Sequence, residues 1–309
     1  HNIELRRIAI SMGYKLNEYG VFRGKKQIAG KSEEEVYKVL GLRYIEPELR
    51  EMTGEIEAAR AGKLPDLIGY QDLKGDLHIQ TNWTDGTNSI EEMAEAAMKM
   101  GLEYIAITDH TKRLTMTHGL DEGRIQKQWT AIDEVNRKLK VKGSKFKVLK
   151  GTECDILKDG SMDLPDNILA KCDMVGASVH SLFNLSKKDQ TERIKRAMSN
   201  PNVDIIFHPT GRILNKRAPY EVDMEELIRH AKKTGTILEI NASDRADLKD
   251  EYIRKCVNEG VKMAIDSDAH AISHFEWLEY GIAQARRGWA EKKDIINAWP
   301  LEKMLKMLK

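Results

Sequence analysis

Residues 75–86, GDLHIQTNWTDG, start as a β-favouring run and then turn polar, and they offer three side chains that can bind a metal ion. His78, Gln80 and Asp85 fall within eight positions. Imidazole and carboxylate are ordinary ligands of divalent ions, whereas a glutamine amide is a neutral and weak oxygen ligand. The stretch is therefore either a turn that happens to hold a histidine or the first part of a metal site.

The same chemistry recurs at the ends of other β-favouring runs. A single histidine at a strand end is usually structural, but five of them beside several acids would leave costly unsatisfied polar groups if no cation joined them. We therefore predict a cluster of divalent ions, in which Glu153 has two oxygens for bridging, and such a cluster suits phosphoester hydrolysis. The candidate residues at these strand ends are His78, Asp109, His110, Glu153, His180, His208, Glu239, Asn241, Asp266, Asp268 and His270.

Positioning residues so far apart in the chain requires a particular architecture. Short β-favouring runs alternate with amphipathic helical runs, which predicts an α/β fold with parallel strands. In a (β/α) barrel the carboxyl ends of the strands meet on one face, so a barrel is favoured over an open sheet. The predicted strands are 76–79, 104–110, 146–156, 173–180, 204–209, 236–243 and 262–270, and the predicted helices include 89–101, 121–140, 187–199, 223–235 and 248–260.

The first part of the chain has a different character. Residues 1–62 read as a helix, a short hairpin and a helix that starts with a capping box, Ser32 with Glu35. This α+β segment is too small for a robust core of its own. We predict a linker at 63–70, where Pro65 and Gly69 break regular structure, and a main domain at 71–309.

Composition limits the function classes. Hydrophobic residues make up 41% of the chain, charged residues 32%, and the net charge is +1, so no bulk basic surface indicates a polyanion partner. The three cysteines, Cys154, Cys172 and Cys256, are widely spaced, which favours a reduced, cytoplasmic protein. No apolar run is long enough to cross a membrane. Because the chain opens on His1, we expect it to be a piece of a longer protein.

The motifs together resemble a known family. HIQTNWTDG, ITDH, GTECDI, SVHS, FHPTGR and DSDAH resemble the metal-binding motifs of the PHP (polymerase and histidinol phosphatase) family over about residues 70–300. HPTGRIL and LEINA resemble more particularly the PHP domain at the C-terminus of bacterial and archaeal family X DNA polymerases, and residues 1–62 are similar to the end of that family's thumb. The resemblance implies a distorted (β/α)₇ barrel with up to three divalent ions, Mn²⁺ or Zn²⁺.

The resemblance also implies how the ligands divide. The first ion would be held by His78, position 80, Glu153 and Asp268; the second by Glu153, His180 and His208; and the third by Asp85, His110 and His270. The family's first motif is usually His-x-His, and here it is His78-Ile79-Gln80. Three outcomes are open: Gln80 binds through oxygen and favours a harder ion such as Mn²⁺, only two ions are held firmly, or the residue lowers activity.

Four further residues are candidates for contact with a nucleic acid. Arg212, close after His208, is predicted to hold a phosphate beside the ions, with a rim arginine paired to an acid as the alternative. Lys112 and Arg113 are candidates for a DNA backbone, with a solvated loop as the alternative. Trp83 is a candidate for stacking on a base, with packing against the barrel rim as the alternative. Together with Glu153 and Asp268, Arg212 completes the set of predicted catalytic residues.

The leading hypothesis is a metal-dependent phosphoesterase that acts on DNA ends in repair. By resemblance this is a 3′–5′ exonuclease, with 3′-phosphatase or abasic-site endonuclease activity as variants. The expected partners are DNA and an upstream polymerase domain, with no membrane, and the expected state is a monomer. We find no palm-type carboxylate pair, so no polymerase activity is expected. The alternatives are a phosphatase of the histidinol phosphate type and a weakened PHP module that only holds DNA.

Overall fold

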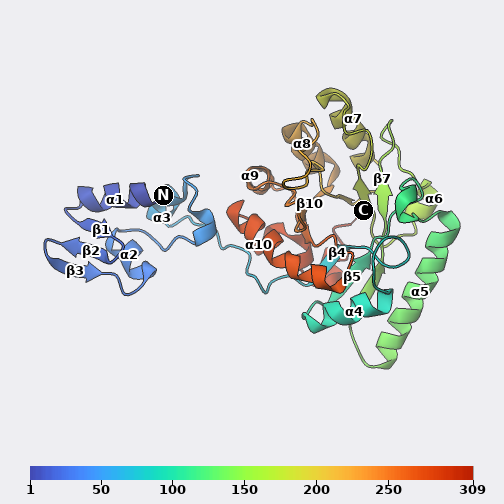
Figure 1. Ribbon diagram of the computed structural model, residues 1–309, viewed down its shortest axis with the longest axis horizontal. Coiled ribbons are helices and arrows are strands. Elements are labelled where there is room, and N and C mark those ends of the chain that lie inside the picture. The colour runs from blue at the N-terminus through green and yellow to red at the C-terminus, as the bar shows by residue number, and fades with distance from the viewer. Residues whose placement is uncertain (309) are drawn as a thin grey trace. The chain divides into compact units, whose positions relative to one another are not determined.

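The computed structural model describes residues 1–308, which form two compact units. The first unit is His1–Asp66 and the second begins at Leu67. Both are drawn in Figure 1. The division falls inside the segment 63–70 that the sequence analysis treats as a linker.

The first unit combines three helices with a small antiparallel sheet. The predicted hairpin is a three-stranded meander, because a second turn at Gly24, where φ is +60°, returns the chain once more. The predicted capping box is only half formed: Ser32 accepts from the Glu35 backbone N–H, but the Glu35 carboxylate accepts from the Lys31 N–H instead. The elements are α1 (Asn2–Ser11), β1 (Lys15–Asn17), β2 (Gly20–Arg23), β3 (Lys26–Ala29), α2 (Glu33–Val39), η1 (Pro47–Leu49) and α3 (Glu55–Ala61).

The second unit is built on parallel strands in two sheets, ordered β4-β5-β6 and β11-β10-β9-β8-β7. Two parallel bridges join the sheets, one between Ile79 and Ala269 and the other between His110 and Glu153, so the strands form a distorted closed ring. The strands are β4 (Gly75–Ile79), β5 (Tyr104–Ile107), β6 (Lys147–Lys150), β7 (Glu153–Asp155), β8 (Gly176–Ser178), β9 (Ile205–Ile206), β10 (Ile237–Asn241) and β11 (Met263–Asp266). The predicted α/β barrel fold is confirmed.

One run that was predicted as a single strand forms two strands in the structure. The run 146–156 divides into β6 and β7, which belong to different sheets. The chain changes sheet at Gly151, whose N–H donates to the Ile107 carbonyl at 2.9 Å. A Cβ at Gly151 would lie 2.8 Å from that carbonyl oxygen and 2.8 Å from Thr108 Cγ2, so glycine permits the close approach. As a result, Glu153 begins a strand at the junction of the two sheets.

Helices cover the outside of the ring (Figure 1). The five predicted helices correspond to α4, α5, α7, α8 and α9, and each buries an apolar face. Ser89 and Glu92 form a complete capping box at α4. The helices are α4 (Ile90–Lys99), α5 (Glu122–Val141), α6 (Asp166–Leu169), α7 (Lys187–Met198), α8 (Met224–Thr234), α9 (Asp250–Glu259), α10 (Leu278–Arg287) and α11 (Leu301–Leu305), with short 3₁₀ turns η2 (Thr115–Thr117), η3 (Ile272–Trp277), η4 (Lys292–Asp294) and η5 (Ile296–Ala298).

The inside of the ring has its own apolar cluster. It gathers Leu77, Tyr104 and Phe207 with Trp299 and other residues of the strands and the C-terminal segment. The Phe207 ring lies over Gly176, where a Cβ would be only 1.9 Å from a ring carbon. This apolar cluster fills the interior of the ring and packs beneath the polar strand ends.

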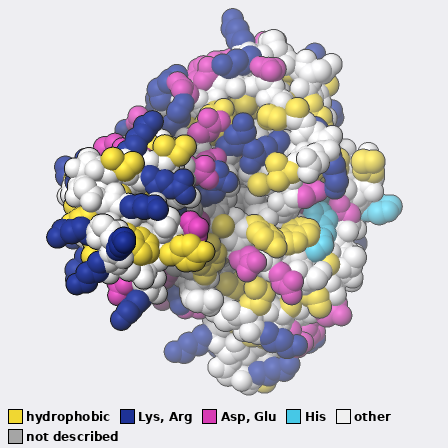
Figure 2. Space-filling model, turned by 60° about the vertical axis from the view of Figure 1, so that its left-hand side comes forward, with side chains coloured by type: hydrophobic (Ala, Val, Ile, Leu, Met, Phe, Trp, Pro, Cys, Tyr) yellow, Lys and Arg dark blue, Asp and Glu magenta, His cyan; other side chains and the backbone are white. Residues whose placement is uncertain are grey.

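The surface agrees with the near-neutral net charge. Figure 2 shows Lys and Arg side chains interspersed with Asp and Glu over the visible face. Within residues 1–308, no helix is long and apolar enough to span a bilayer. Cys154, Cys172 and Cys256 are free thiols.

Candidate metal centre

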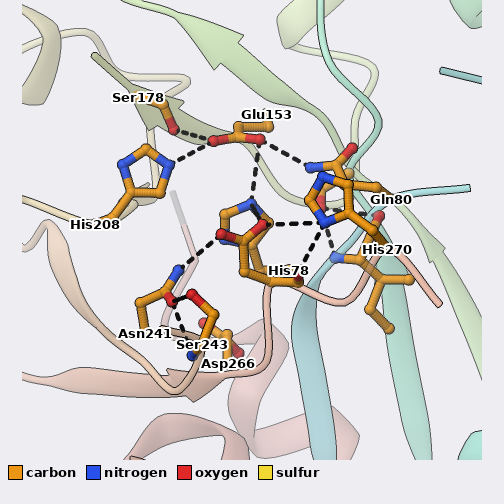
Figure 3. A network of polar contacts seen from close by, with 12 residues as sticks. His78, Gln80, Glu153, Ser178, His208, Asn241, Ser243, Asp266 and His270 are labelled. Carbon is orange, nitrogen blue, oxygen red and sulfur yellow. Dashed lines mark hydrogen bonds and ion pairs between the residues drawn. The ribbon is translucent and has the colours of Figure 1, made fainter. Parts of the chain in front are cut away.

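The strand ends of the second unit bring the predicted ligands together. His78 lies within β4 and Gln80 directly after it, while His110, His180 and His208 follow β5, β8 and β9. The remaining ligand candidates are Asp85, in the loop after β4, Glu153, at the start of β7, and Asp268 and His270, just after β11. Figure 3 shows the central part of this cluster, with His78, Gln80 and His208 directed toward Glu153.

Glu153 is the centre of the arrangement. Its Oε1 lies 2.8 Å from His208 Nε2 and 3.0 Å from His180 Nε2. Its Oε2 lies 3.0 Å from His110 Nδ1 and 3.2 Å from His78 Nε2. The carboxylate is 1% exposed, so four imidazoles converge on one buried anion. Each oxygen faces two imidazole nitrogens, which is the arrangement a bridging carboxylate requires.

Three groups of side chains have ligand atoms close enough to share an ion. One of them, Asp85 with His110 and His270, is the set expected for the third ion. The other two combine the ligands in different ways, but His208 Nε2 and His180 Nε2 also share Glu153 Oε1, so the expected division of the ligands stays a prediction. The three groups are His78, His208 and Asp268; Asp85, His110 and His270; and His110, Glu153 and His180.

His110 belongs to two of these groups. Its Nδ1 faces Glu153 and its Nε2 lies 3.6 Å from Asp85 Oδ2. A neutral imidazole has one lone pair, so His110 serves one group at a time. The group with Asp85 and His270 is also the most open, since these two side chains are 32% and 31% exposed whereas His78 is fully buried.

Buried atoms in the cluster fit a cation. His78 Nε2, His110 Nδ1 and Gln80 Oε1 make no hydrogen bond with any residue of 1–308, although carboxylate oxygens lie within 3.2 Å of the two nitrogens. Buried polar atoms are nearly always satisfied in native proteins. Nitrogen and oxygen donors that face one another without hydrogen-bond geometry are suitably placed for a shared ion. The mixed imidazole and carboxylate set suits Zn²⁺ or Mn²⁺.

Gln80, in place of the expected second histidine, makes a specific contact. Its Nε2 donates to Glu153 Oε2 at 2.8 Å, and its Oε1 is the buried atom without a partner. The amide therefore satisfies part of the Glu153 charge.

Acids and amides behind the ligands fix their orientation. Glu239 Oε1 lies 2.6 Å from His78 Nδ1, and Asp155 Oδ1 lies 2.8 Å from His180 Nδ1. Asn241 donates to Asp268 Oδ2 at 3.2 Å. Such contacts hold imidazoles in one tautomer and orientation. Asp155 was not predicted from sequence; the signal was a second acid two residues after Glu153 on the same face of a strand.

Electrostatics in the cluster is dominated by its opposed charges. Burial disfavours charged His78, but the carboxylates of Asp268, Glu239 and Glu153 outweigh it and raise its pKa well above the usual range. Burial works against ionised Glu153 too, yet the surrounding histidines hold its pKa well below normal. His208 differs, because burial and the charge of Arg245 lower its pKa to about 3. It is therefore a neutral imidazole, which is the form that binds a metal.

Two ligand candidates occupy unusual backbone conformations. The φ angle of His208 is +30° and that of Asp268 is +53°. Side chains other than glycine rarely adopt this region, and such strain of about 1–3 kcal/mol each collects at functional sites. Both residues follow strands, and they are the two ligand candidates among the eight non-glycine positions of residues 1–308 that have a positive φ.

The arginine that reaches the cluster is Arg245, which the sequence analysis missed. Its Nε lies 3.2 Å from Asp268 Oδ2, and its Nη1 is buried without a partner among residues 1–308. The guanidinium of Arg212 instead donates through Nε and Nη2 to the carbonyls of Arg245 and Ala246. Both arginines lie in loops after neighbouring strands, and sequence alone does not reveal which one turns inward.

The other predicted nucleic-acid contacts are placed on the rim. Lys112 pairs with Glu122 at 2.5 Å, and Arg113 approaches Asp155 Oδ2 at 3.8 Å. Trp83 packs partly buried against the outer core, and its carbonyl accepts from Arg124. Their contact with DNA stays a prediction.

Comparison with known protein families places two regions of the chain. Residues 1–51 match the DNA polymerase beta thumb family, and residues 76–243 match the PHP domain family. The two matches lie in the first and second units of the structure, respectively.

Individual relatives repeat this division. The chain is 42% identical over 312 residues to a "DNA polymerase/3′-5′ exonuclease PolX" of Bacillus subtilis. The match covers 100% of this chain and 54% of that protein. The chain thus spans about half the length of this relative. A probable phosphatase of Thermoanaerobacter sp. strain X514 is 34% identical over 195 residues, covering 59% of this chain and 73% of the relative.

A solved structure supports the fold. Histidinol phosphate phosphatase of Lactococcus lactis, complexed with zinc, L-histidinol and phosphate, has a TM-score of 0.52 and 16% sequence identity. The likeness covers 71% of this chain and 95% of that one.

Proposed function

Because the chain belongs to the PHP domain family, we propose that it is a divalent-metal-dependent phosphoesterase that removes nucleotides from the 3′ end of DNA. The observation that carries this proposal is the buried Glu153 carboxylate, faced by four imidazoles and the Gln80 amide. No hydrogen-bonding role requires so many nitrogens around one anion, whereas shared ions do.

The ions would be held by the three groups described above. Divalent ions in such a cluster lower the pKa of an attacking water and neutralise charge on the phosphoryl group. Glu153 belongs to one group and also lies within 3.2 Å of His78 and His208 of another, and Glu239 and Asp155 keep His78 and His180 oriented toward the ions.

Arg245 supplies the part of charge stabilisation that belongs to the chain itself. Its guanidinium is anchored through Nε to Asp268, which leaves the buried Nη1 to donate to a phosphoryl oxygen. A donor fixed in advance stabilises developing charge without reorganisation. This assignment replaces Arg212, whose guanidinium is committed to two backbone carbonyls.

DNA is favoured over a small phosphate ester by the first unit. Residues 1–51 match a DNA polymerase thumb, and a relative that spans both units is named as a polymerase and 3′-5′ exonuclease. A thumb segment has no evident use in an enzyme for a small metabolite.

The test is nucleotide release from a 5′-labelled primer with Mn²⁺ or Zn²⁺ added. The wild-type chain is expected to shorten the primer from its 3′ end, and Glu153→Gln, which keeps the shape but removes the charge, is expected to lower the rate by at least about 100-fold. Equal rates in the two proteins would refute the proposal. A primer ending in 3′-phosphate tests the phosphatase variant in the same assay.

A phosphatase of the histidinol phosphate type is the second candidate. It is favoured by relatives named as probable phosphatases and by the fold likeness to histidinol phosphate phosphatase. Turnover of histidinol phosphate without primer shortening would support it.

A further inference from the structure

Two loops that carry metal ligands meet through an arginine and an aromatic ring. Arg217 Cζ lies 4.4 Å from the centre of the Phe183 ring, in the loop that follows His180. Arg217 Nε donates to the Gly211 carbonyl at 2.8 Å, and the Gly211 N–H donates to the His208 carbonyl at 2.9 Å. The guanidinium is therefore fixed between the segments that bear His180 and His208.

The ring beneath the guanidinium is itself held in place. Phe183 lies nearly parallel to Tyr220, with an angle of 16° and 6.1 Å between centres. Tyr220 is buried, and its hydroxyl donates to the Pro209 carbonyl at 2.7 Å. Arg217 thus rests on a rigid support that is tied to the residue next to His208.

The charge of Arg217 is not neutralised by the protein. No carboxylate among residues 1–308 lies within 4.0 Å of its guanidinium, and its Nη1 and Nη2 make no hydrogen bond with them. The neighbouring Lys216, by contrast, pairs with Asp244 at 2.8 Å. Burial and the nearby charge of Arg245 lower the pKa of Arg217 against the smaller opposing effects of Tyr220 and Asp247, so an anion placed there would add a close partner that the fold does not supply.

We propose that Arg217, supported by Phe183, binds a second phosphodiester group of the DNA strand, next to the phosphodiester group that is cleaved. The inference rests on the proposed function and adds a second phosphate subsite to it. The planar guanidinium offers two free Nη donors, which match phosphate oxygens.

Such a subsite selects a polynucleotide. A phosphate monoester or a one-nucleotide ester has a single phosphoryl group, which the metal centre itself engages. Only a strand with a further phosphodiester can also reach Arg217, so the contact contributes to binding of DNA and not to the small ester.

The test compares Arg217→Gln with Lys216→Ala, a neighbouring cation that already has an acid partner. Steady-state kinetics are measured on a single-stranded oligonucleotide and on thymidine 5′-(4-nitrophenyl phosphate), and oligonucleotide binding is measured by fluorescence anisotropy at several salt concentrations. Arg217→Gln is expected to raise KM for the oligonucleotide about tenfold relative to KM for the ester, and to reduce the slope of log Kd against log salt by about one. Lys216→Ala is expected to change these quantities less than about twofold.

The outcomes separate the two proposals. If the wild-type chain degrades the oligonucleotide but Arg217→Gln leaves its KM ratio and salt slope unchanged, the subsite is refuted and the exonuclease stands. If the wild-type chain does not degrade DNA, the proposed function fails, and the anisotropy comparison still decides whether Arg217 contacts a strand. Equal melting temperatures of the variants exclude a folding defect as the cause.

Discussion

Gln80 donates its side-chain N–H to Oε2 of Glu153 at 2.8 Å, and both side chains are buried. The amide thus occupies a direction from which the carboxylate would otherwise face an ion. For Gln80 to bind an ion through Oε1, which has no partner, this hydrogen bond must be given up or shared. The contact gives a physical reason for a weakened ion at this position.

Replacing Gln80 by histidine is expected to raise the ion content. Gln80→His removes the amide donor and adds an imidazole with higher affinity for Zn²⁺. Elemental analysis after dialysis should show more ions per chain than in the wild type, by up to one. Gln80→Leu is the matched control, because it also frees Glu153 but adds no ligand. Equal ion content in Gln80→His and Gln80→Leu would contradict the prediction.

The pH dependence of stability is expected to differ between the metal-free and the loaded protein. Burial opposes charging of His110, but Glu153 and Asp85 outweigh it and raise its pKa from 6.5 to about 10. The folded, metal-free chain therefore binds this proton more tightly than the unfolded chain does. The resulting stability is fully present below about pH 6.5 and is lost as the pH rises through about 10.

An ion must displace that proton, so its affinity should increase over the same range. Between about pH 6.5 and about pH 8.5, the rise in melting temperature caused by added Zn²⁺ is expected to grow, while the melting temperature in chelator falls. His230→Gln, which removes a histidine outside the cluster, should keep both trends. A constant ion-induced shift across this range would show that no proton is released.

Loss of the acid behind His78 is expected to weaken ion binding without removing a ligand. Glu239→Gln replaces the carboxylate that lies 2.6 Å from His78 Nδ1 with a neutral amide. Supporting contacts of this kind are worth about 10–100-fold in metal affinity. Competition with a fluorescent chelator measures the change, and Glu225→Gln on the outer face of α8 serves as the control. If Glu239→Gln binds the ion with an affinity within about twofold of the wild type, His78 does not need this acid for ion binding.

We expect Arg212 to affect catalysis only through Arg245, whose backbone carbonyl it holds. Arg245→Gln should lower kcat on DNA by about 100-fold, whereas Arg212→Gln should lower it less, because Arg212 acts through the carbonyls of Arg245 and Ala246. The double variant should then match Arg245→Gln alone. Ion content is measured in parallel, since Arg245 also contacts Asp268. Additive losses in the double variant would restore an independent role for Arg212.

The strand-end positions of the candidate ligands could be predicted from sequence, but the contacts among them could not. Polar residues that follow β-favouring runs indicate the rim of a barrel, because parallel strands share a direction. Which ligands pair depends on which strands are neighbours when the ring closes. His208 shares Glu153 Oε1 with His180, while the adjacent Phe207 stacks on the His78 ring with 3.8 Å between ring centres. No local pattern encodes such a contact.

The choice between Arg212 and Arg245 was also beyond the sequence. Both follow a strand by a few residues, and both lie in polar loops. The direction of each side chain depends on backbone turns, such as the positive φ of +42° at Ala246, which no residue type announces. The split of the run 146–156 was missed for a similar reason, since a single glycine between two β-favouring stretches does not by itself indicate a change of sheet.

The ring has two seams, and each is flanked by candidate ligands. His110 and Glu153 are themselves the bridge partners at one seam, and His78 and Asp268 adjoin the Ile79–Ala269 bridge at the other. A cation at either place would cross-link one sheet to the other. It would add to hydrogen bonds that already close the ring, such as those from the Gln80 N–H to the Ala269 carbonyl at 2.8 Å and from the Glu153 N–H to the Thr108 carbonyl at 2.9 Å.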